Sequence, residues 1–403
     1  MMKWWPAAFA AVLCLVYFIV LPSVSVHAPA DERAHFSAEQ LARLEKGAAY
    51  RAAHRSLYLI SVPLELVLLA FLSAGLGRLL ERWTGSGVGG WVLFALLSLL
   101  VLFVLTLPLA YVSGVVLERR WGFLRMSTGA WFWERVKALG IKALLAAGAA
   151  ALLALLVRRF GRLWWLPASA AAALLSLLLV LLAPLLIDPL FAKFEPLRDR
   201  RLADRLLETA ERAGVPAGRV LVTDASVRHT HTNTYFSGLW GTRRIVLYDT
   251  LLRRHPPDEV EVIVAHEAGH ARNHDVAVGL LLYVLSVPLV LLSAHLLAVR
   301  LFGEGFVRRP RMTAFVTLVC VAAAVLSAPV ANYASRRVEA RADLEALRLS
   351  GDPDAFIRTE VRLAVDNLGE LHPGRLSYVF FNTHPTPLER IGMAEAFKAG
   401  RLR

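Results

Sequence analysis

Residues Val264–Asp275 read V-A-H-E-A-G-H-A-R-N-H-D and are followed at once by an apolar segment, Val276–Val299. Within the stretch, His266, Glu267 and His270 form the pattern H-E-x-x-H. In a helix, positions i and i+4 lie on one face, so both imidazoles can bind a single Zn²⁺ ion. Glu267 lies beside them and can act as a general base toward a water molecule on the metal, which lowers the pKa of that water to roughly 7. A surface helix that carries two histidines by chance shows the same pattern, so the surrounding sequence has to decide.

Apolar residues make up 57% of the 403 residues and charged residues only 19%, which is typical of an integral membrane protein. The formal net charge is +13, and the basic residues cluster beside the apolar segments. Such clusters indicate anchoring at a lipid bilayer, whereas a nucleic-acid groove combines basic residues with stacking aromatic side chains. The composition therefore predicts the bilayer as a partner and predicts no binding to nucleic acid.

Seven apolar segments have about the 20 residues that a helix needs to cross a bilayer. The first could also be a signal peptide, but its apolar run is long and only Lys3 precedes it, so we expect an uncleaved span. The predicted spans are 5–27, Leu57–Leu80, Trp91–Leu117, Leu139–Val157, Leu163–Ile187, Val276–Val299 and Thr313–Asn332.

The distribution of Lys and Arg predicts the orientation of these spans. Segments 29–56 and 118–138 are rich in basic residues, which favours the cytoplasmic side for both. The short loops 158–162 and 300–312 on the other side are also basic, so the prediction depends on the weight given to the first segments. The Ala-, Leu- and Arg-rich composition is typical of bacteria. We therefore expect a multi-pass protein of the bacterial cytoplasmic membrane with its zinc site on the cytoplasmic side.

The polar segments predict a mostly α-helical fold with a small β-sheet. Charged residues alternate with Leu at helical spacing from Arg198 to Ala213, and β-branched runs at Arg219–Thr223 and Arg243–Tyr248 predict strands of a hairpin or three-stranded sheet. The zinc-binding helix is expected to begin at Asp258 with Glu261 in a capping box. The predicted parts are 1–187 with spans one to five, 188–275 with the sheet and the H-E-x-x-H helix, 276–332 with spans six and seven, and 333–403 with the third zinc ligand and the C-terminal helices.

A catalytic zinc site usually has three protein ligands, so one is missing from the H-E-x-x-H stretch. Spans six and seven form a hairpin, which returns the chain at 333–343 beside the helix at 258–275 and makes Glu339 the best candidate. Asp343 lies one turn further on the same face and can accept the second N–H of a zinc-bound imidazole. The alternative is a solvated helix face, on which these acids pair with Arg336, Arg337 and Arg341.

Several stretches resemble the Ste24-type integral-membrane zinc metallopeptidases, that is, CAAX prenyl protease 1 and its bacterial relatives in peptidase family M48. The resemblance covers most of the chain and is far more specific than H-E-x-x-H alone. The matching stretches are Asp188–Leu197, Asn233–Phe236, Arg244–Leu251, His266–His270, Ser335 and Arg336 with Glu339 and Asp343, Thr383–Pro385 and Glu389–Ile391.

This resemblance implies a polytopic α-helical membrane protein with a gluzincin-like zinc metalloprotease domain and one Zn²⁺ per chain. It implies that His266, His270 and Glu339 bind the zinc and that Glu267 is the base. Asp343 and Arg336 would support the ligands from behind, and His384 and Arg390 would line the catalytic cleft. The edge strand formed by Asn233, Thr234, Tyr235 and Phe236 would take up a peptide or membrane-protein substrate by β-addition. In the family, the spans enclose a large water-filled chamber.

The resemblance thus predicts an endopeptidase that hydrolyses membrane-associated proteins or peptides, with CAAX processing as one form of that activity. One alternative is a membrane quality-control protease of the HtpX kind, and another is a metal sensor or transporter that is not an enzyme. Glu65 and His295 lie inside predicted spans, where ionisable residues usually face a cavity. No role is assigned to these two residues, or to His229 and His231 in the polar insertion.

Overall fold

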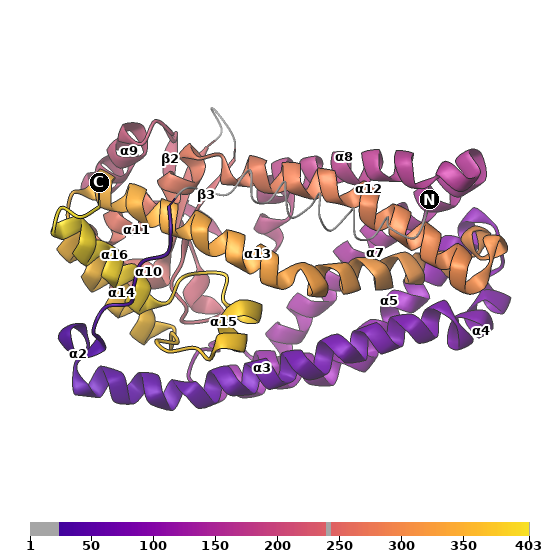
Figure 1. Ribbon diagram of the computed structural model, residues 1–403, viewed down its shortest axis with the longest axis horizontal. Coiled ribbons are helices and arrows are strands. Elements are labelled where there is room, and N and C mark those ends of the chain that lie inside the picture. The colour runs from indigo at the N-terminus through magenta and orange to yellow at the C-terminus, as the bar shows by residue number, and fades with distance from the viewer. Residues whose placement is uncertain (1–23, 239–242, 403) are drawn as a thin grey trace.

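The computed structural model describes residues 24–238 and 243–402. Its described part contains six helices that are long and apolar enough to cross a membrane, and they run along the long axis of the molecule (Figure 1). They match predicted spans two to seven, whereas the first predicted span, 5–27, lies almost entirely outside the described residues. The six are α3 (Ala38–Ser73), α5 (Val88–Tyr111), α7 (Thr128–Phe160), α8 (Trp165–Leu186), α12 (Asp275–Phe302) and α13 (Met312–Ser350).

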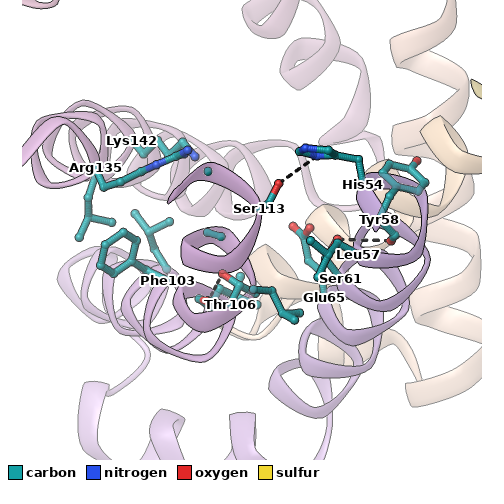
Figure 2. Close-up of a pocket in the computed structure, with 16 residues that line it drawn as sticks. His54, Leu57, Tyr58, Ser61, Glu65, Phe103, Thr106, Ser113, Arg135 and Lys142 are labelled. Carbon is teal, nitrogen blue, oxygen red and sulfur yellow. Dashed lines mark hydrogen bonds between the residues drawn. The ribbon is translucent and has the colours of Figure 1, made fainter. Parts of the chain in front are cut away.

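The six helices form a ring in the order α3, α5, α7, α8, α12 and α13, and α13 packs against α3 to close it. A buried cluster that includes Trp91, Trp164, Phe306 and Met312 fills the end of the ring far from the sheet. Nearer the sheet, helices α3, α5 and α7 line a cavity of 670 Å³ (Figure 2). The ring is therefore tightly packed at one end and contains a cavity between three of its helices.

Two of these helices extend well beyond the bilayer-spanning segments predicted from the sequence. Helix α3 begins at Ala38, where Ser37 and Gln40 form a capping box, and its first half buries Leu44 against Leu388 and other residues of the C-terminal part. Helix α13 continues without a break from Met312 to Ser350. The last span and the polar helix that follows it are thus a single rigid element, which carries side chains from the membrane into the polar end of the molecule.

The polar end contains a four-stranded sheet in the order β1, β2, β4, β3. Strands β2 (Arg219–Thr223) and β4 (Arg244–Tyr248) match the prediction and are parallel, whereas β1 (Phe194–Pro196) and β3 (Thr234–Ser237) pair with them in antiparallel fashion. The prediction of a hairpin or three-stranded sheet missed β1, because three residues that end in a proline carry no alternating pattern. Strand β3 pairs with β4 through Tyr235 and Val246 and is an edge of the sheet.

The remaining helices surround the sheet and the polar end of the ring. Helix α11 (Pro257–Arg272) carries the H-E-x-x-H pattern, packs against α13 and lies beside β3. The other helices are α2 (Glu32–His35), α4 (Gly75–Thr84), α6 (Glu118–Arg120), α9 (Arg200–Arg212), α10 (Asp249–Arg254), α14 (Pro353–Asp366), α15 (Arg375–Phe381) and α16 (Pro387–Lys398).

The start of α11 differs from the predicted capping box at Asp258 and Glu261. Pro256 occupies the N-cap and Pro257 the first helical position, which suits proline because the missing N–H would be unpaired there anyway. Glu261 does not cap the helix but accepts a hydrogen bond of 3.0 Å from Thr209 and pairs with Arg212, both in α9. The predicted cap was wrong because this carboxylate is used to join two helices.

Helix α11 also ends before the membrane-spanning helix begins. His274 has a φ of 56°, in the left-handed region, and separates Arg272 at the end of α11 from Asp275 at the start of α12. The H-E-x-x-H helix is therefore adjacent to the sixth predicted span and not continuous with it.

Candidate metal centre

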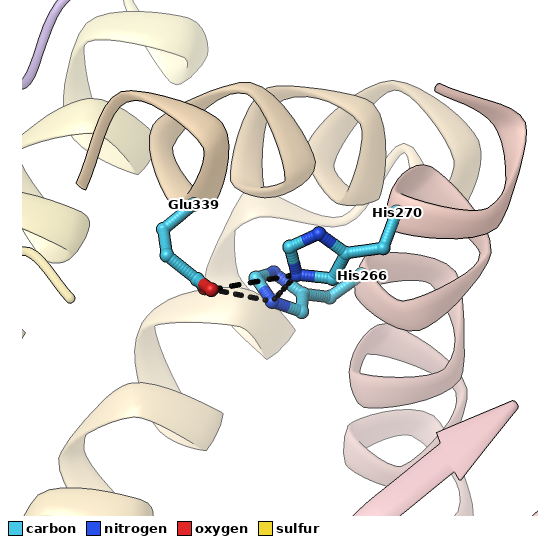
Figure 3. A group of neighbouring side chains, drawn as sticks. All are labelled: His266, His270 and Glu339. Carbon is cyan, nitrogen blue, oxygen red and sulfur yellow. Dashed lines mark hydrogen bonds and ion pairs between the residues drawn. The ribbon is translucent and has the colours of Figure 1, made fainter. Parts of the chain in front are cut away.

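Three side chains from two helices meet at one point (Figure 3). His266 and His270 come from adjacent turns of α11 and Glu339 comes from α13, and a ligand atom from each lies within 4.8 Å of the others. The Nε2 atom of His266 is 3.3 Å from Glu339 Oε2, and the Nε2 atom of His270 is 3.6 Å from Glu339 Oε1. The structure thus brings together the three residues that the sequence predicts as metal ligands.

Gly269 allows the two helices to approach closely at this point. A Cβ atom on Gly269 would lie 3.1 Å from the Cβ of Glu345 and 3.2 Å from the carbonyl oxygen of Ala342, both in α13. These distances are shorter than ordinary van der Waals contacts, so only glycine fits without moving α13. The glycine between the two histidines therefore helps to set the distance at which Glu339 faces them.

A carboxylate holds each imidazole from behind. The Nδ1 atom of His266 lies 2.8 Å from Asp343, and the Nδ1 atom of His270 lies 2.8 Å from Asp275. When Nδ1 donates its hydrogen to a carboxylate, the lone pair of Nε2 points toward the metal position. Asp343 is the residue predicted for this role, whereas Asp275 was not predicted although it follows His270 by only five positions.

The two histidines are strongly basic in this environment. Burial disfavours the charged imidazole of His266, but the hydrogen bonds to Asp343 and Glu339 outweigh this effect and raise its pKa to about 10. For His270, Asp275 and Glu339 likewise overcome the effect of burial and raise the pKa to about 9. The cluster is therefore arranged to stabilise positive charge between its side chains.

The donor atoms fit a divalent metal ion. The two Nε2 atoms face each other at 3.1 Å, which places two lone pairs in repulsive contact when both imidazoles are neutral. Glu339 Oε2 is buried and has no partner besides the His266 ring within the described part of the chain. A cation between the three side chains would satisfy all of these atoms, and two imidazoles with one carboxylate are donors that transition metals prefer.

Glu267 lies beside the cluster on a cavity of 250 Å³ that is also lined by His266, His384 and Asn233. Burial raises the pKa of Glu267, although the neighbouring histidines oppose this shift. A carboxylate whose pKa is raised toward neutrality is suited to accepting and returning a proton. The placement of Glu267 matches the general-base role predicted for it.

His384 lies between α15 and α16, beside Glu339, and lines the same cavity as Glu267. Its Nε2 atom is 3.4 Å from Glu339 Oε1, its Nδ1 atom is 2.8 Å from the hydroxyl of Thr383, and 60% of its side chain is exposed. Protein atoms around the ring remove part of its hydration, and this loss together with the positive charges of Arg390 and His266 lowers the pKa of His384, although Glu339 opposes the shift. A neutral, partly exposed imidazole at this place can donate a hydrogen bond to a bound molecule.

Arg390 borders the cavity of Glu267 and His384, as predicted, and its guanidinium lies behind the His266 ring. Its Nε atom donates to Asp343 at 2.9 Å, and its Nη1 atom pairs with Glu360 at 2.8 Å. This geometry favours a positioning role for Arg390, because it holds the carboxylate that holds His266. Burial raises the pKa of Glu360 to about 7 although Arg390 opposes the shift, and no sequence pattern marked this residue.

Arg336, which was predicted to support the metal ligands, contacts a different part of the site. It donates hydrogen bonds to the carbonyl oxygens of Tyr378 and Asn382, at 3.0 Å and 2.7 Å, and its guanidinium lies 4.2 Å from the centre of the Tyr378 ring. Because Asn382 precedes His384 by two positions, Arg336 fixes the segment that carries His384. Its link to the metal cluster is therefore indirect.

The predicted substrate strand borders the same cavity. Asn233 lines it, and the following residues Thr234–Ser237 form β3, which lies beside α11. Thr234 fixes the strand by a hydrogen bond of 2.9 Å to the carbonyl oxygen of Val246. The structure thus places an edge strand, the H-E-x-x-H helix and the third ligand around one opening.

Comparisons with known proteins show the family of this chain. The model of peptidase family M48 matches residues 196–398, and the model described as the CAAX prenyl protease N-terminal domain with five membrane helices matches residues 23–193. An uncharacterized metalloprotease of Bacillus subtilis, YhfN, is 29% identical over 98% of this chain and 97% of its own length. CAAX prenyl protease 1 of Saccharomyces cerevisiae is 32% identical over 42% of this chain and 38% of its own.

The fold is also that of a solved structure. The crystal structure of S. mikatae Ste24p superposes with a TM-score of 0.81, covers 97% of both chains and shares 23% of residues. These findings favour the predicted peptidase over the alternatives of a metal sensor, a transporter or a quality-control protease of the HtpX kind. The M48 model spans half of the chain, and the chain therefore belongs to peptidase family M48, as a multi-pass membrane metallopeptidase with an N-terminal domain of the CAAX prenyl protease type.

Proposed function

We propose that this protein is a zinc-dependent endopeptidase that cleaves membrane-associated proteins or peptides at the surface of the bilayer. The observation that supports this most directly is the convergence of His266, His270 and Glu339 with a carboxylate behind each imidazole. Two histidines, one glutamate and a nearby free carboxylate are the set of groups that zinc peptidases use. Glu267 supplies that free carboxylate.

The residues of the chain divide the reaction between them. When bound, Zn²⁺ would polarise the peptide carbonyl and make water acidic enough to attack it. Glu267 accepts the proton from the attacking water and passes it to the nitrogen of the leaving amine. His384 donates a hydrogen bond to the oxygen on which negative charge develops, and such donors typically contribute about 3–4 kcal/mol to lowering the barrier.

The edge strand accounts for how a peptide is held during this reaction. The free edge of β3 can pair with an extended substrate backbone, and Asn233 at its start borders the cavity of Glu267. Hydrogen bonds along the backbone hold a peptide in place without requiring a particular side chain at every position. Processing of prenylated CAAX proteins, the activity after which several relatives are named, is one form that this activity can take.

We also propose that the metal centre faces the cytoplasm of a bacterial cell. The polar segments at the sheet end of the ring include the basic residues of 29–56 and 118–138, which favour the cytoplasmic side. A fluorescent protein fused after residue 403 tests this orientation, because it becomes fluorescent in the bacterial cytoplasm and not after export across the membrane. A fusion that is expressed at full length but stays dark would contradict the proposal.

The peptidase mechanism is tested with purified full-length protein and internally quenched peptides, with and without a chelator. Glu267→Gln should bind zinc normally and lose cleavage, because the amide cannot accept the proton. Glu339→Ala should lose zinc, because only two ligands remain. Asp258→Asn, an exposed change near the start of the same helix, is the control and should cleave as the wild type does. Zinc-dependent turnover by Glu267→Gln would refute the mechanism, and full zinc occupancy in Glu339→Ala would refute the ligand assignment.

A further inference from the structure

A second cavity lies inside the helical part of the protein, apart from the cavity at the metal centre. It has a volume of 670 Å³ and is lined by residues of α3, α5, the π-helical turn Val112–Leu117 that follows α5, and α7. Most of its lining is apolar, but Arg135 and Lys142 of α7 and Glu65 of α3 also border it. Figure 2 shows Glu65 on the α3 side of the cavity and the two basic side chains on the α7 side.

These charged side chains have no partner of opposite charge in the part of the chain that the structure describes. Among the described residues, the structure shows no ion pair for Arg135, Lys142 or Glu65, and the guanidinium of Arg135 only lies 5.0 Å from the centre of the Trp131 ring. Charged side chains in membrane-spanning segments are costly, usually face a water-filled cavity, and often mark the path of a substrate or an ion. With two cations and one anion, the cavity has an excess of positive charge.

The end of the second cavity nearest the sheet, here called its entrance, is bordered by His54 and is linked to the segment that precedes the edge strand. His54, which borders the cavity, pairs with Glu118 at 3.2 Å, and Glu118 also pairs with His231 at 3.3 Å. His231 precedes Asn233, which borders the metal-site cavity, by two positions. A peptide held on β3 at Asn233 therefore has one end close to the entrance of the second cavity.

The charged groups lie at defined depths below this entrance. Ser113 forms a hydrogen bond with His54, and a Cβ atom on the adjacent Gly114 would lie 2.9 Å from the ring nitrogen of Trp131. Because Ser113 and Gly114 are neighbours, His54 of α3 and Trp131 of α7 lie at the same level, that is, at the same distance along the ring of helices. Arg135 lies four residues beyond Trp131, or about 6 Å at the rise of a helix. Lys142 and Glu65 each lie eleven residues beyond that level on their own helices, or about 16 Å. Helices α3 and α7 both run away from the sheet, so Lys142 and Glu65 lie at a similar depth (Figure 1).

We propose that this cavity binds a carboxylate of the peptide substrate, either its C-terminal carboxylate or an acidic side chain, through Arg135 and Lys142. The apolar lining accommodates the neighbouring apolar side chains. An extended chain advances about 3.3 Å per residue, so the carboxylate lies roughly two to five residues beyond the segment that pairs with β3. The inference rests on the proposed peptidase function, because it assigns the recognition of one part of the substrate.

Binding to the full-length Glu267→Gln protein in nanodiscs tests this proposal without requiring cleavage. The probes are three fluorescent apolar decapeptides, one with a free C-terminal carboxylate, one with a C-terminal carboxamide, and one carboxamide with an internal Asp in place of Asn. The free acid should bind about tenfold more tightly than the carboxamide, as expected for a charge-assisted contact. If an acidic side chain is the natural group, the Asp peptide regains the tight binding.

The variant Arg135→Gln/Lys142→Gln should bind the acid and the carboxamide equally, whereas Arg135→Lys should retain most of the preference. Arg159→Gln removes a cation from the far end of the same helix and serves as the matched control, which should keep the full preference. Zinc content equal to that of the parent protein shows that the double variant is folded.

Equal binding of all three peptides by the parent protein would overturn the proposal, as would an unchanged preference in the double variant. If the double change, made in the protein that retains Glu267, instead removed only a dependence of peptide cleavage on phosphatidylglycerol in the nanodisc, the cavity would be a lipid site and the proposal would also fail. A wild-type protein that prefers the acid but cleaves no peptide would refute the peptidase function and support this binding site. The experiments therefore distinguish a failure of the carboxylate-binding proposal from a failure of the proposed peptidase function.

Discussion

Asp275 gives the sharpest test of how the metal centre is held together. It is the first residue of α12 and accepts the Nδ1 hydrogen of His270 at 2.8 Å, while its other oxygen pairs with Arg341 of α13. It therefore connects the helix that carries two ligands to the helix that carries the third. Removal of such a partner typically lowers metal affinity 10–100-fold, or by about 1.4–2.7 kcal/mol.

Two substitutions separate the charge of Asp275 from its hydrogen bond. Asp275→Asn keeps an oxygen that accepts from Nδ1 but removes the charge, so we expect a loss near the lower figure of about tenfold. Asp275→Ala removes both and also frees the His270 ring, so we expect a loss near the upper figure of about a hundredfold. The zinc dissociation constant of each variant is measured by competition with a fluorescent chelator, and peptide cleavage is measured at saturating zinc.

Two controls accompany this experiment. Asp258→Asn removes an exposed carboxylate near the other end of the H-E-x-x-H helix and should leave zinc affinity unchanged. Arg341→Gln removes the second partner of Asp275 and leaves the His270 hydrogen bond intact, so its effect should be smaller than that of Asp275→Ala. If Asp275→Ala bound zinc as tightly as the wild type, the orientation of His270 would not depend on this carboxylate and the reasoning would be refuted.

Three further predictions concern packing, catalysis and pH. Gly269→Val should push α11 and α13 apart and weaken zinc binding, measured with the same chelator. Gly279→Val on α12, where a Cβ has open space, is the control and should bind zinc as the wild type does. Equal zinc affinity of the two variants would contradict the close approach of α11 and α13. His384→Ala should lower kcat by about a hundredfold or more with zinc content unchanged, measured by peptide cleavage, and a purely KM effect would argue against a role in the transition state. Burial disfavours the charged form of Glu259, but hydrogen bonds from His255 and Arg362 outweigh burial and lower the pKa of this carboxyl group. The ionised carboxylate therefore stabilises the fold above its unfolded pKa of about 4.5, and this stabilisation is lost as the pH falls through the lower folded pKa. Thermal unfolding in detergent should therefore show Glu259→Gln destabilised at pH 7, with a smaller difference from the wild type near pH 4, and an equal difference at both pH values would show that the charge is not responsible.

The sequence predicted those features that depend on local pattern. Apolar runs of about 20 residues identified six helices that the structure describes, and β-branched runs located β2 and β4. The spacing of His266 and His270 placed them on one helix face, and the hairpin of the last two spans led to Glu339. Each of these inferences uses residues close in sequence, or a connection short enough to restrict where the chain returns.

Other features were beyond such patterns because they depend on how helices pack. The carboxylate of Glu261 appeared to cap α11, but it bonds to α9, a contact that only packing creates. Arg390 lines the cavity as expected, but only the structure shows that it also joins Asp343 to Glu360 on α14. Nothing in the sequence around Glu360 distinguishes it from a surface carboxylate, because its burial is decided by the helices that surround it.

The sequence by itself determined that the chain is a helical membrane protein with a metal-binding helix, because hydrophobic length and helical spacing are properties of short segments. Only the tertiary structure decided that α13 passes 3.2 Å from the Cβ position of Gly269, that Asp275 orients His270, and that Arg135 and Lys142 border a cavity in the ring. These features join residues that lie far apart in the chain or on different helices. Their positions follow from the close packing of whole helices, in which each contact depends on all the others.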